Sequence, residues 1–324
     1  MSGNRGKQSD NPLDRGDLHA IRDTLSRVAV RAGEVILGKD HQIRLALVCL
    51  VAGGHLLIED LPGVGKTTLA HVLACTLGLR FNRIQFTSDL MPGDVLGGAV
   101  YNRDDRRFEF HPGPIFAQLI LADEINRATP KTQSALLEAM EEHQVTVEGE
   151  TRPLPKPFFV IATQNPAYQV GTFPLPESQL DRFLMRIDLG YPDHGAERAL
   201  LRGRDRRELL AQLTPAMSPQ ELTDIQVRVA EVHVSDPLLD YLQALIEHTR
   251  HDPRFTLGLS PRAGLALMRA AQAWALFVGR DYVVPEDLQA VLPHVVAHRL
   301  TSTSGGTGGG LQAVRHLLEA VPVR

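Results

Sequence analysis

The chain has 324 residues, of which 43% are hydrophobic and 22% are charged, and its formal net charge is -4. The composition is typical of a globular protein, and the length exceeds what one compact core usually organises, so two domains are expected. The slight negative charge argues against a chain that binds nucleic acid permanently, because such chains are usually basic.

Cysteine content and hydropathy indicate the cellular compartment of the chain and whether it enters a membrane. With only Cys49 and Cys75, neither a disulfide framework nor a Cys-x-x-Cys metal site can be built. Residues 1–16 are polar and carry no apolar core, which predicts a disordered segment and no signal peptide. The longest apolar stretch, residues 45–58, falls short of the ~20 residues that span a bilayer. We therefore expect a cytoplasmic protein without direct membrane insertion.

From residue 18 the sequence predicts helices that alternate with short buried strands. Apolar residues at helical spacing predict helices over residues 18–37 and 40–52. Next come a short apolar strand at residues 55–59, a glycine-containing loop and a helix over residues 67–77. Such an alternation predicts a parallel sheet covered on both faces, which is an α/β fold. Further strands are predicted at residues 81–86, 118–122 and 158–162, and a further helix at residues 131–142.

Two predicted hairpins interrupt this alternation. The first lies in a segment rich in Gly, Pro and Asp, and the second is turned by Gly149. Both are interpreted as insertions into the α/β pattern. Their expected strands are residues 99–101 with 107–110, and residues 144–147 with 151–154.

The pattern changes near residue 192. We expect a nucleotide-binding α/β domain over residues 17–192 and a helical domain over residues 193–324, because no comparable strand pattern follows the boundary. A linker rich in Ser, Thr and Gly is predicted at residues 301–310, followed by a short helix at 311–320. The other expected helices are residues 196–210, 219–232, 237–251, 261–279 and 285–299.

The loop after the first predicted strand is the first motif that carries chemistry. Gly63 and Gly65 let backbone N–H groups approach phosphates, and the helix that starts there adds a favourable dipole. Lys66 can reach the β- and γ-phosphates, and Thr67 can place its hydroxyl on Mg²⁺. The loop therefore predicts ATP and Mg²⁺ as cofactors. The expected nucleotide-binding residues of the loop are Pro62, Gly63, Val64, Gly65, Lys66, Thr67 and Thr68.

One position departs from the P-loop pattern G-x-x-x-x-G-K-[ST]. Asp60 stands where the pattern has its first glycine, while the Gly-Val-Gly-Lys-Thr core is intact. The start of the loop is therefore not defined by the pattern.

Two further predicted strands end in polar residues. Asp123 and Glu124 follow an apolar strand, so the first can hold Mg²⁺ and the second can polarise an attacking water. Asn165 follows another strand and can contact the γ-phosphate or orient that water. Alone, acidic strand ends are common and Asn-Pro marks only a turn. The pairing with a preceding P-loop favours one nucleotide site at the end of the sheet.

In this order the motifs resemble those of the MoxR-type AAA+ ATPases. The segments that carry the resemblance are Asp-Leu-Pro-Gly-Val-Gly-Lys-Thr (60–67), Ala-Asp-Glu-Ile-Asn-Arg-Ala (122–128), Ala-Thr-Gln-Asn-Pro (162–166) and Leu-Pro-Glu-Ser-Gln-Leu-Asp-Arg-Phe (175–183). The similarity extends from about residue 20 to the C-terminus. It implies a P-loop NTPase core with a three-layer parallel sheet, an all-α lid domain after it, and ATP hydrolysis.

The resemblance also implies a role for each polar strand end. Lys66, Thr67 and Asp123 would bind Mg-ATP, Glu124 would activate the water, and Asn165 would be the first sensor residue.

Three residues outside these strand ends acquire roles only through the resemblance. Arg182 would be the arginine finger that reaches the neighbouring subunit's nucleotide, and Arg262 would be the second sensor from the lid. Gly38 would lie near the adenine. Alternatives stay open for both arginines. Arg182 could instead form an intrachain salt bridge, and Arg262 could be a plain surface residue. Another arginine could also be the finger.

The resemblance implies a homo-oligomeric ring, by family expectation a hexamer, that remodels or activates partner protein complexes. Such partners often carry von Willebrand factor A domains. The two hairpins match the helix-2 insert and the pre-sensor-1 insert of this clade, and the first is expected to face the ring pore. Two alternative functions stay open. The first is a nucleic-acid motor, with which the basic residues Arg103, Arg106 and Arg107 are compatible. The second is an ATP-dependent binding switch without turnover.

Overall fold

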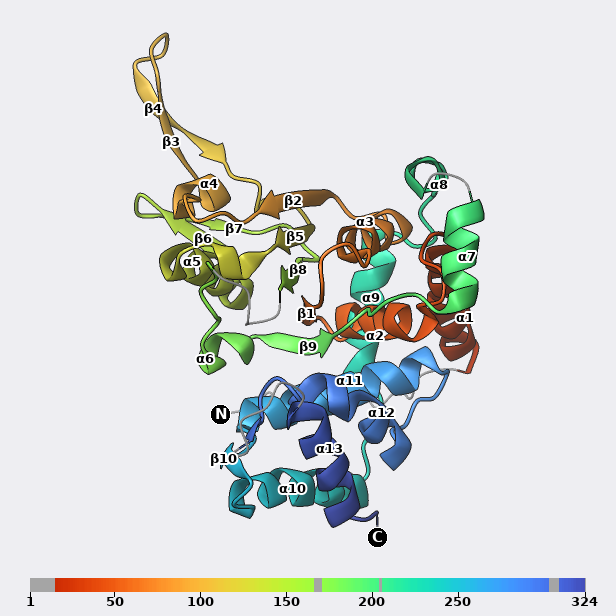
Figure 1. Cartoon of the computed structure of the whole chain (residues 1–324). Helices are drawn as coiled ribbons and strands as arrows, with labels where there is room; N and C mark the ends of the chain where they lie inside the picture. The colour runs from red at the N-terminus through yellow and green to blue at the C-terminus, as the bar shows by residue number, and fades with distance from the viewer. Residues whose placement is uncertain (1–14, 166–170, 204–205, 303–308, 324) are drawn as a thin grey trace, which may run out of the picture.

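The computed structural model describes residues 15–165, 171–203, 206–302 and 309–323 (Figure 1). A five-stranded sheet with the order β2-β5-β8-β1-β9 lies at the centre of the α/β part, and all its pairings are parallel. The predicted α/β class with a parallel sheet is thus confirmed. The strands are β1 His55–Glu59, β2 Phe81–Gln85, β5 Leu119–Asp123, β8 Phe159–Gln164 and β9 Phe183–Ile187.

The sheet is covered on both faces because its strand residues alternate between two hydrophobic clusters. Leu56 and Ile58 join the larger cluster with the first three helices, whereas Leu57 joins the smaller cluster with α5. This gives the three layers that the resemblance implied. The helices are α1 Arg15–Val35, α2 Asp40–Val51, α3 Lys66–Thr76 and α5 Pro130–Glu142.

The helical lid continues the larger cluster rather than forming a separate one. Leu267, Leu276 and Val291 of the lid are fully buried together with Leu45 and Leu47 of α2. Among the described residues, no helix combines the length and the apolar character that crossing a bilayer requires. The helices after the sheet are α7 His194–Arg202, α8 Arg206–Gln212, α9 Pro219–Val229, α10 Asp236–His251, α11 Pro261–Phe277, α12 Pro285–Val296 and α13 Gly309–Ala320.

The two hairpins are present but differ in their surroundings. The first pairs β3 Gly97–Asn102 with β4 Arg107–Pro112 and projects away from the body, beyond the short helix α4 Pro92–Leu96 (Figure 1). At its root, a Cβ atom on Gly97 would collide with backbone atoms of His111 and Gly113, and one on Gly113 with backbone atoms of Val95 and Gly97. The second hairpin pairs β6 Gln144–Val147 with β7 Glu150–Pro153 and lies against the end of α5.

Several elements differ from the sequence-based expectation. Strand β9 was missed, because a five-residue apolar run that contains an arginine does not distinguish a strand from a helix segment. The lid was expected to be helical only, yet β10 Phe255–Leu257 pairs with β11 Thr301–Ser302 inside the predicted linker. The single helix predicted over residues 196–210 corresponds to α7 and α8, because α7 ends at Arg202 with Gly203 as its C-cap.

Some predictions fall on positions that the structure does not describe. Of the expected disordered segment, residues 1–14 lie outside the described residues, while α1 already begins at Arg15. Residues 303–308 of the predicted linker, residues 204–205 and the proline of the Gln-Asn-Pro motif lie outside them as well.

Candidate functional site

The carboxyl ends of the parallel strands bring the predicted site residues together. The register pairs Gln85 with Asp123 and Glu59 with Gln164, so the ends of β2, β5, β8 and β1 form one edge. The P-loop leaves β1 at that edge. A cavity of about 310 Å³ lies there, and we call it, with its surrounding side chains, the P-loop edge. The cavity is lined by Pro62, Gly63, Gly65, Lys66, Thr67, Thr68, Asp123, Glu124 and Asn165.

The P-loop presents backbone N–H groups rather than side chains at the start of α3. Gly65 is the N-cap residue with φ 97°, a left-handed conformation that favours glycine, and no side chain caps the helix. The first N–H groups of α3 are therefore left for an anion, and the helix dipole favours one there. This is the arrangement that binds nucleotide phosphates.

Asp60 explains the departure from the P-loop pattern. Its Oδ2 accepts hydrogen bonds from the N–H groups of Leu189 at 2.7 Å and Gly190 at 2.6 Å, and its Oδ1 accepts one from Leu61. The carboxylate thereby ties the start of the loop to the chain that follows β9. A glycine could not make these contacts, so the aspartate anchors the loop.

The ammonium group of Lys66 is held by oxygens of the chain itself. Its Nζ donates to the Asp60 carbonyl at 2.6 Å and to Asn165 Oδ1 at 3.4 Å, and the residue is only 8% exposed. Burial lowers the pKa of Lys66, while the carboxylates of Asp60, Asp123 and Glu124 oppose that shift. Phosphate oxygens could replace these neutral acceptors with charged ones, which favours nucleotide binding.

Asp123 and Thr67 present hard oxygen ligands side by side. Thr67 Oγ1 lies 3.5 Å from Asp123 Oδ2, and Thr163 donates a 2.6 Å hydrogen bond to Asp123 Oδ1. A hydroxyl and a buried carboxylate at the rim of a phosphate-binding loop are ligands that suit Mg²⁺. The residues present therefore fit the cation that the P-loop predicts.

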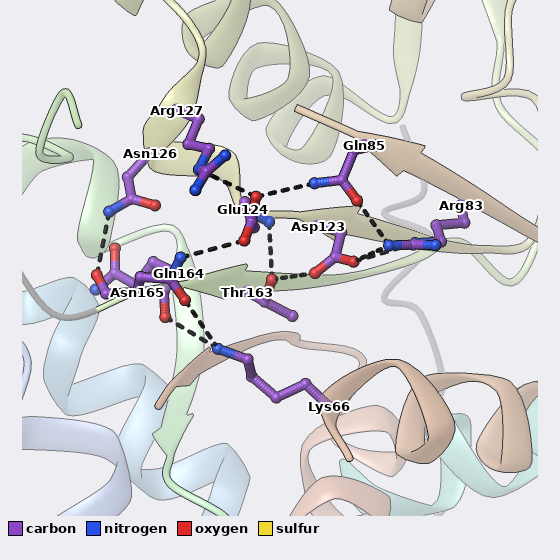
Figure 2. A network of polar contacts seen from close by, with 10 residues as sticks. All are labelled: Lys66, Arg83, Gln85, Asp123, Glu124, Asn126, Arg127, Thr163, Gln164 and Asn165. Carbon is purple, nitrogen blue, oxygen red and sulfur yellow. Dashed lines mark hydrogen bonds and ion pairs between the residues drawn. The ribbon is translucent and has the colours of Figure 1, made fainter. Parts of the chain in front are cut away.

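Three neighbouring side chains hold the Glu124 carboxylate at the P-loop edge (Figure 2). Its backbone is left-handed, with φ 57° and ψ 47°, and its N–H donates to Thr163 Oγ1 at 2.8 Å. Asn165 donates to Oε1 at 3.2 Å, while Gln85 and Arg127 each reach Oε2 at 3.1 Å. A left-handed non-glycine residue costs roughly 1–3 kcal/mol and persists where neighbours hold it. Several contacts at once thus fix the orientation of the Glu124 carboxylate.

Arg182 and Arg262 lie elsewhere, and neither lines the cavity. Both bind Glu141 at the end of α5: Arg182 Nη2 lies 2.9 Å from Oε2, and Arg262 Nη1 lies 3.1 Å from Oε1. These three half-exposed side chains form what we call the arginine edge. Nearby, the buried Arg299 donates to Asp181 Oδ1 at 2.6 Å and so ties the lid to the residue before Arg182.

Gly38 is also absent from the cavity lining. It has φ 67°, and a Cβ there would meet the side chains of Ala196 and Asp193 at the start of α7. The predicted adenine position is therefore packed against the lid's first helix.

Several contacts of the site were missed by sequence reasoning. Arg83 and Gln85 alternate on β2, so their side chains share one face of the sheet edge, a signal that the predicted strand contained. Arg127 follows Glu124 by one helical turn, which is also readable. Glu141 had no local signal, because it meets Arg262 from a position 121 residues away.

A second polar group lies in the lid. The ligand atoms of His248, Asp252 and His316 lie within 4.8 Å of one another. Arg254, however, donates to both carboxylate oxygens of Asp252 at 3.0–3.2 Å. The carboxylate therefore already has a cation, and the group is interpreted as an ion-pair cluster that joins α10 to α13.

Comparisons with known proteins agree with this geometry. Residues 55–185 match the model of the ATPase family associated with various cellular activities (AAA), and residues 247–313 match that of the AAA lid domain. The chain is 45% identical to the uncharacterized protein YeaC of Bacillus subtilis, over 95% of this chain and 96% of that one. It is 40% identical to chaperone MoxR1 of Mycobacterium tuberculosis, over 88% and 78% respectively. A crystal structure of a candidate ATPase from Cytophaga hutchinsonii superposes with a TM-score of 0.86 at 37% identity, over 95% and 97% of the two chains.

Proposed function

The chain belongs to the MoxR family of AAA+ ATPases, and we propose that it hydrolyses ATP at the P-loop edge as one subunit of a ring. The observation that carries the proposal is the convergence of Lys66, Thr67, Asp123, Glu124 and Asn165 on one cavity. Three separate segments supply these side chains: the start of α3, the end of β5 and the end of β8. Together they offer hydrogen-bond donors to phosphate, cation ligands and a carboxylate base.

Each of these side chains has a task in hydrolysis. The N–H groups of the P-loop and the Lys66 ammonium would hold the phosphates and balance charge on the γ-phosphate. Glu124 would orient the attacking water and accept its proton as the bond to the γ-phosphorus forms and ADP leaves. Asn165, which donates to Glu124, would keep that carboxylate directed at the water. Bound through Thr67 and Asp123, Mg²⁺ would neutralise phosphate charge.

The positions of two arginines support a proposal about assembly. Arg182 and Arg262, the arginines expected to stabilise charge on the transferred phosphate, lie together at the arginine edge instead. We propose that both act on the nucleotide of a neighbouring subunit, so that a ring, by family expectation a hexamer, is the active unit. An arginine supplied in this way contributes roughly 10³–10⁵ in rate.

The projecting hairpin and the named relatives support a proposal about what the ring acts on. The β3–β4 hairpin exposes Tyr101 and Phe108, whose rings pack edge to face at 5.3 Å, and thus offers an apolar contact surface to a protein. We propose remodelling of partner proteins, including proteins with von Willebrand factor A domains. The basic cluster considered for nucleic acid is diluted, because Arg107 pairs with Glu109 at 2.9 Å and with Asp105 at 3.5 Å.

The test compares the wild type with Glu124→Gln and Lys66→Ala. Glu124→Gln should bind ATP with unchanged affinity and lose turnover by roughly 10²–10⁴, because only the base is removed. Lys66→Ala should lose binding itself. Nucleotide affinity is measured with a fluorescent ATP analogue, and turnover by phosphate release. A wild type that binds ATP but releases no phosphate in any assembly state would favour a binding switch instead.

A further inference from the structure

The carboxylate expected to hold Mg²⁺ already has a cation beside it. Arg83 of β2 donates to Asp123 Oδ2 from Nε at 3.0 Å and from Nη2 at 2.6 Å (Figure 2). The other oxygen, Oδ1, is occupied by the hydroxyl of Thr163. Oδ2 is therefore the oxygen that Asp123 shares between Arg83 and the neighbouring Thr67.

A divalent cation bound to that oxygen would compete with the Arg83 guanidinium for it. Thr67 and Asp123 Oδ2, the two expected ligands, lie 3.5 Å apart, so a cation between them would face Arg83 directly. Two cations at such a distance repel each other strongly in a partly buried site. Arg83 is the one that can leave, because its side chain is 49% exposed and water can take over its hydrogen bonds.

Arg83 is also linked to Glu124. Its Nη2 donates to Gln85 Oε1 at 2.6 Å, and Gln85 Nε2 donates to Glu124 Oε2 at 3.1 Å. Departure of Arg83 from Asp123 would remove the contact that orients the Gln85 amide. One of the donors that hold Glu124 then loses its support.

We propose that Arg83 is the resident counter-cation of Asp123 in the nucleotide-free chain and that it leaves Oδ2 when Mg-ATP binds. The inference rests on the proposed function, because it assumes that the P-loop edge takes a metal-bound nucleotide. Arg83 is a positioning residue: it acts through Asp123 and Gln85 and keeps Glu124 held until the nucleotide arrives.

The experiment measures binding of a fluorescent, non-hydrolysable ATP analogue as free Mg²⁺ is varied. In Arg83→Met no side-chain cation competes for Oδ2, so the Mg²⁺ concentration at half-binding should fall about tenfold relative to the wild type. Arg228→Met is the matched control, because Arg228 is also a partly exposed arginine paired with a carboxylate, Glu231, but lies outside the P-loop edge. Its Mg²⁺ midpoint should stay within about twofold of the wild-type value.

A second measurement separates competition from a structural role. Without nucleotide, Arg83→Met should melt at a lower temperature than the wild type, since Asp123 loses its counter-ion. Saturating Mg²⁺ and the analogue should abolish that difference. If Arg83→Met does not fold, Arg83→Lys serves instead, and its midpoint should also fall because an ammonium makes one contact where the guanidinium makes two.

The outcomes are distinguishable. An unchanged or raised Mg²⁺ midpoint in the folded Arg83 variant would overturn the inference, because Arg83 would then support cation binding rather than compete with it. A wild type that binds no nucleotide at any Mg²⁺ concentration would overturn the proposed function instead.

Discussion

The charged side chains of the P-loop edge and of the arginine edge differ in burial and in the number of their partners. At the P-loop edge Lys66, Asp123 and Asn165 are buried, and each has several partners within the chain. At the arginine edge, Arg182 and Arg262 are partly exposed and share one carboxylate, Glu141. The first edge is preorganised by a single chain, whereas the second is available for a partner. Under the proposed function, a single subunit would bind the nucleotide and the assembly would hydrolyse it.

The largest expected effect tests that division directly. Arg182→Ala should lower kcat by about 10³ or more, with nucleotide affinity unchanged, because the finger acts on another subunit's site. When Arg182→Ala is mixed with the equally inactive Lys66→Ala, activity should return, since the second variant supplies intact fingers to the first one's intact P-loops. Phosphate release from the mixture is the measurement. A mixture as inactive as its components would place the finger in its own subunit.

A smaller effect comes from the buried histidine at the start of β1. His55 starts β1, accepts the Val160 N–H at Nδ1 and therefore donates from Nε2 to the carbonyl of Met140, next to Glu141. Burial lowers the pKa of His55 to about 4 from 6.5. The unfolded chain then binds the extra proton between these values, so the free energy of unfolding should fall as pH drops from 6.5 to 4, by at most about 3 kcal/mol.

Urea unfolding at a series of pH values checks the His55 prediction. His55→Gln removes the titrating group, so its stability should depend less on pH over this interval than that of the wild type. Parallel curves for the two proteins would show that His55 takes no part in the acid sensitivity.

Arg262→Ala should have an effect of intermediate size. If Arg262 also contacts a neighbour's nucleotide, its loss should lower kcat about tenfold, the value of one charge-assisted hydrogen bond. The same change in a ring that already carries Arg182→Ala should add less, because both arginines would act on one phosphate. Equal effects in both backgrounds would separate the two arginines functionally.

Glu141→Gln should have the smallest effect. Because its two ion pairs are partly exposed, the loss of stability should stay within about 1 kcal/mol. Thermal unfolding checks this value, with Glu138→Gln on the same helix as the control. A loss of several kcal/mol would mean that the arginine edge is as tightly organised as the P-loop edge.

Sequence reasoning predicted the P-loop edge because chain order and strand direction decide it. Once residues 55–59, 118–122 and 158–162 are interpreted as parallel strands, Asp123, Glu124 and Asn165 must meet at one edge. The anchoring role of Asp60 was not predictable, because its partners follow β9, the strand that was missed. Likewise, Arg83 could be placed on β2 but not paired with Asp123 until the order of the strands was known.

The arginine edge could not be predicted in the same way. Its members come from α5, the segment before β9 and the start of α11, and no local pattern records how a lid packs against a sheet. For Arg182, the intrachain salt bridge kept as an alternative is present in the isolated chain. The role of the finger in a ring stays a prediction.

The root of the β3–β4 hairpin has a mechanical consequence. Gly97 and Gly113 bring two backbone segments into direct contact, because a Cβ atom on either residue would collide with the facing backbone. The two strands are paired along their whole length, from Gly97 with Pro112 to Asn102 with Arg107. We therefore expect the two paired strands to move as one rigid unit that pivots at the Gly97–Gly113 contact. A small rotation of α4 would then displace Tyr101 and Phe108, further along the hairpin, by a larger distance.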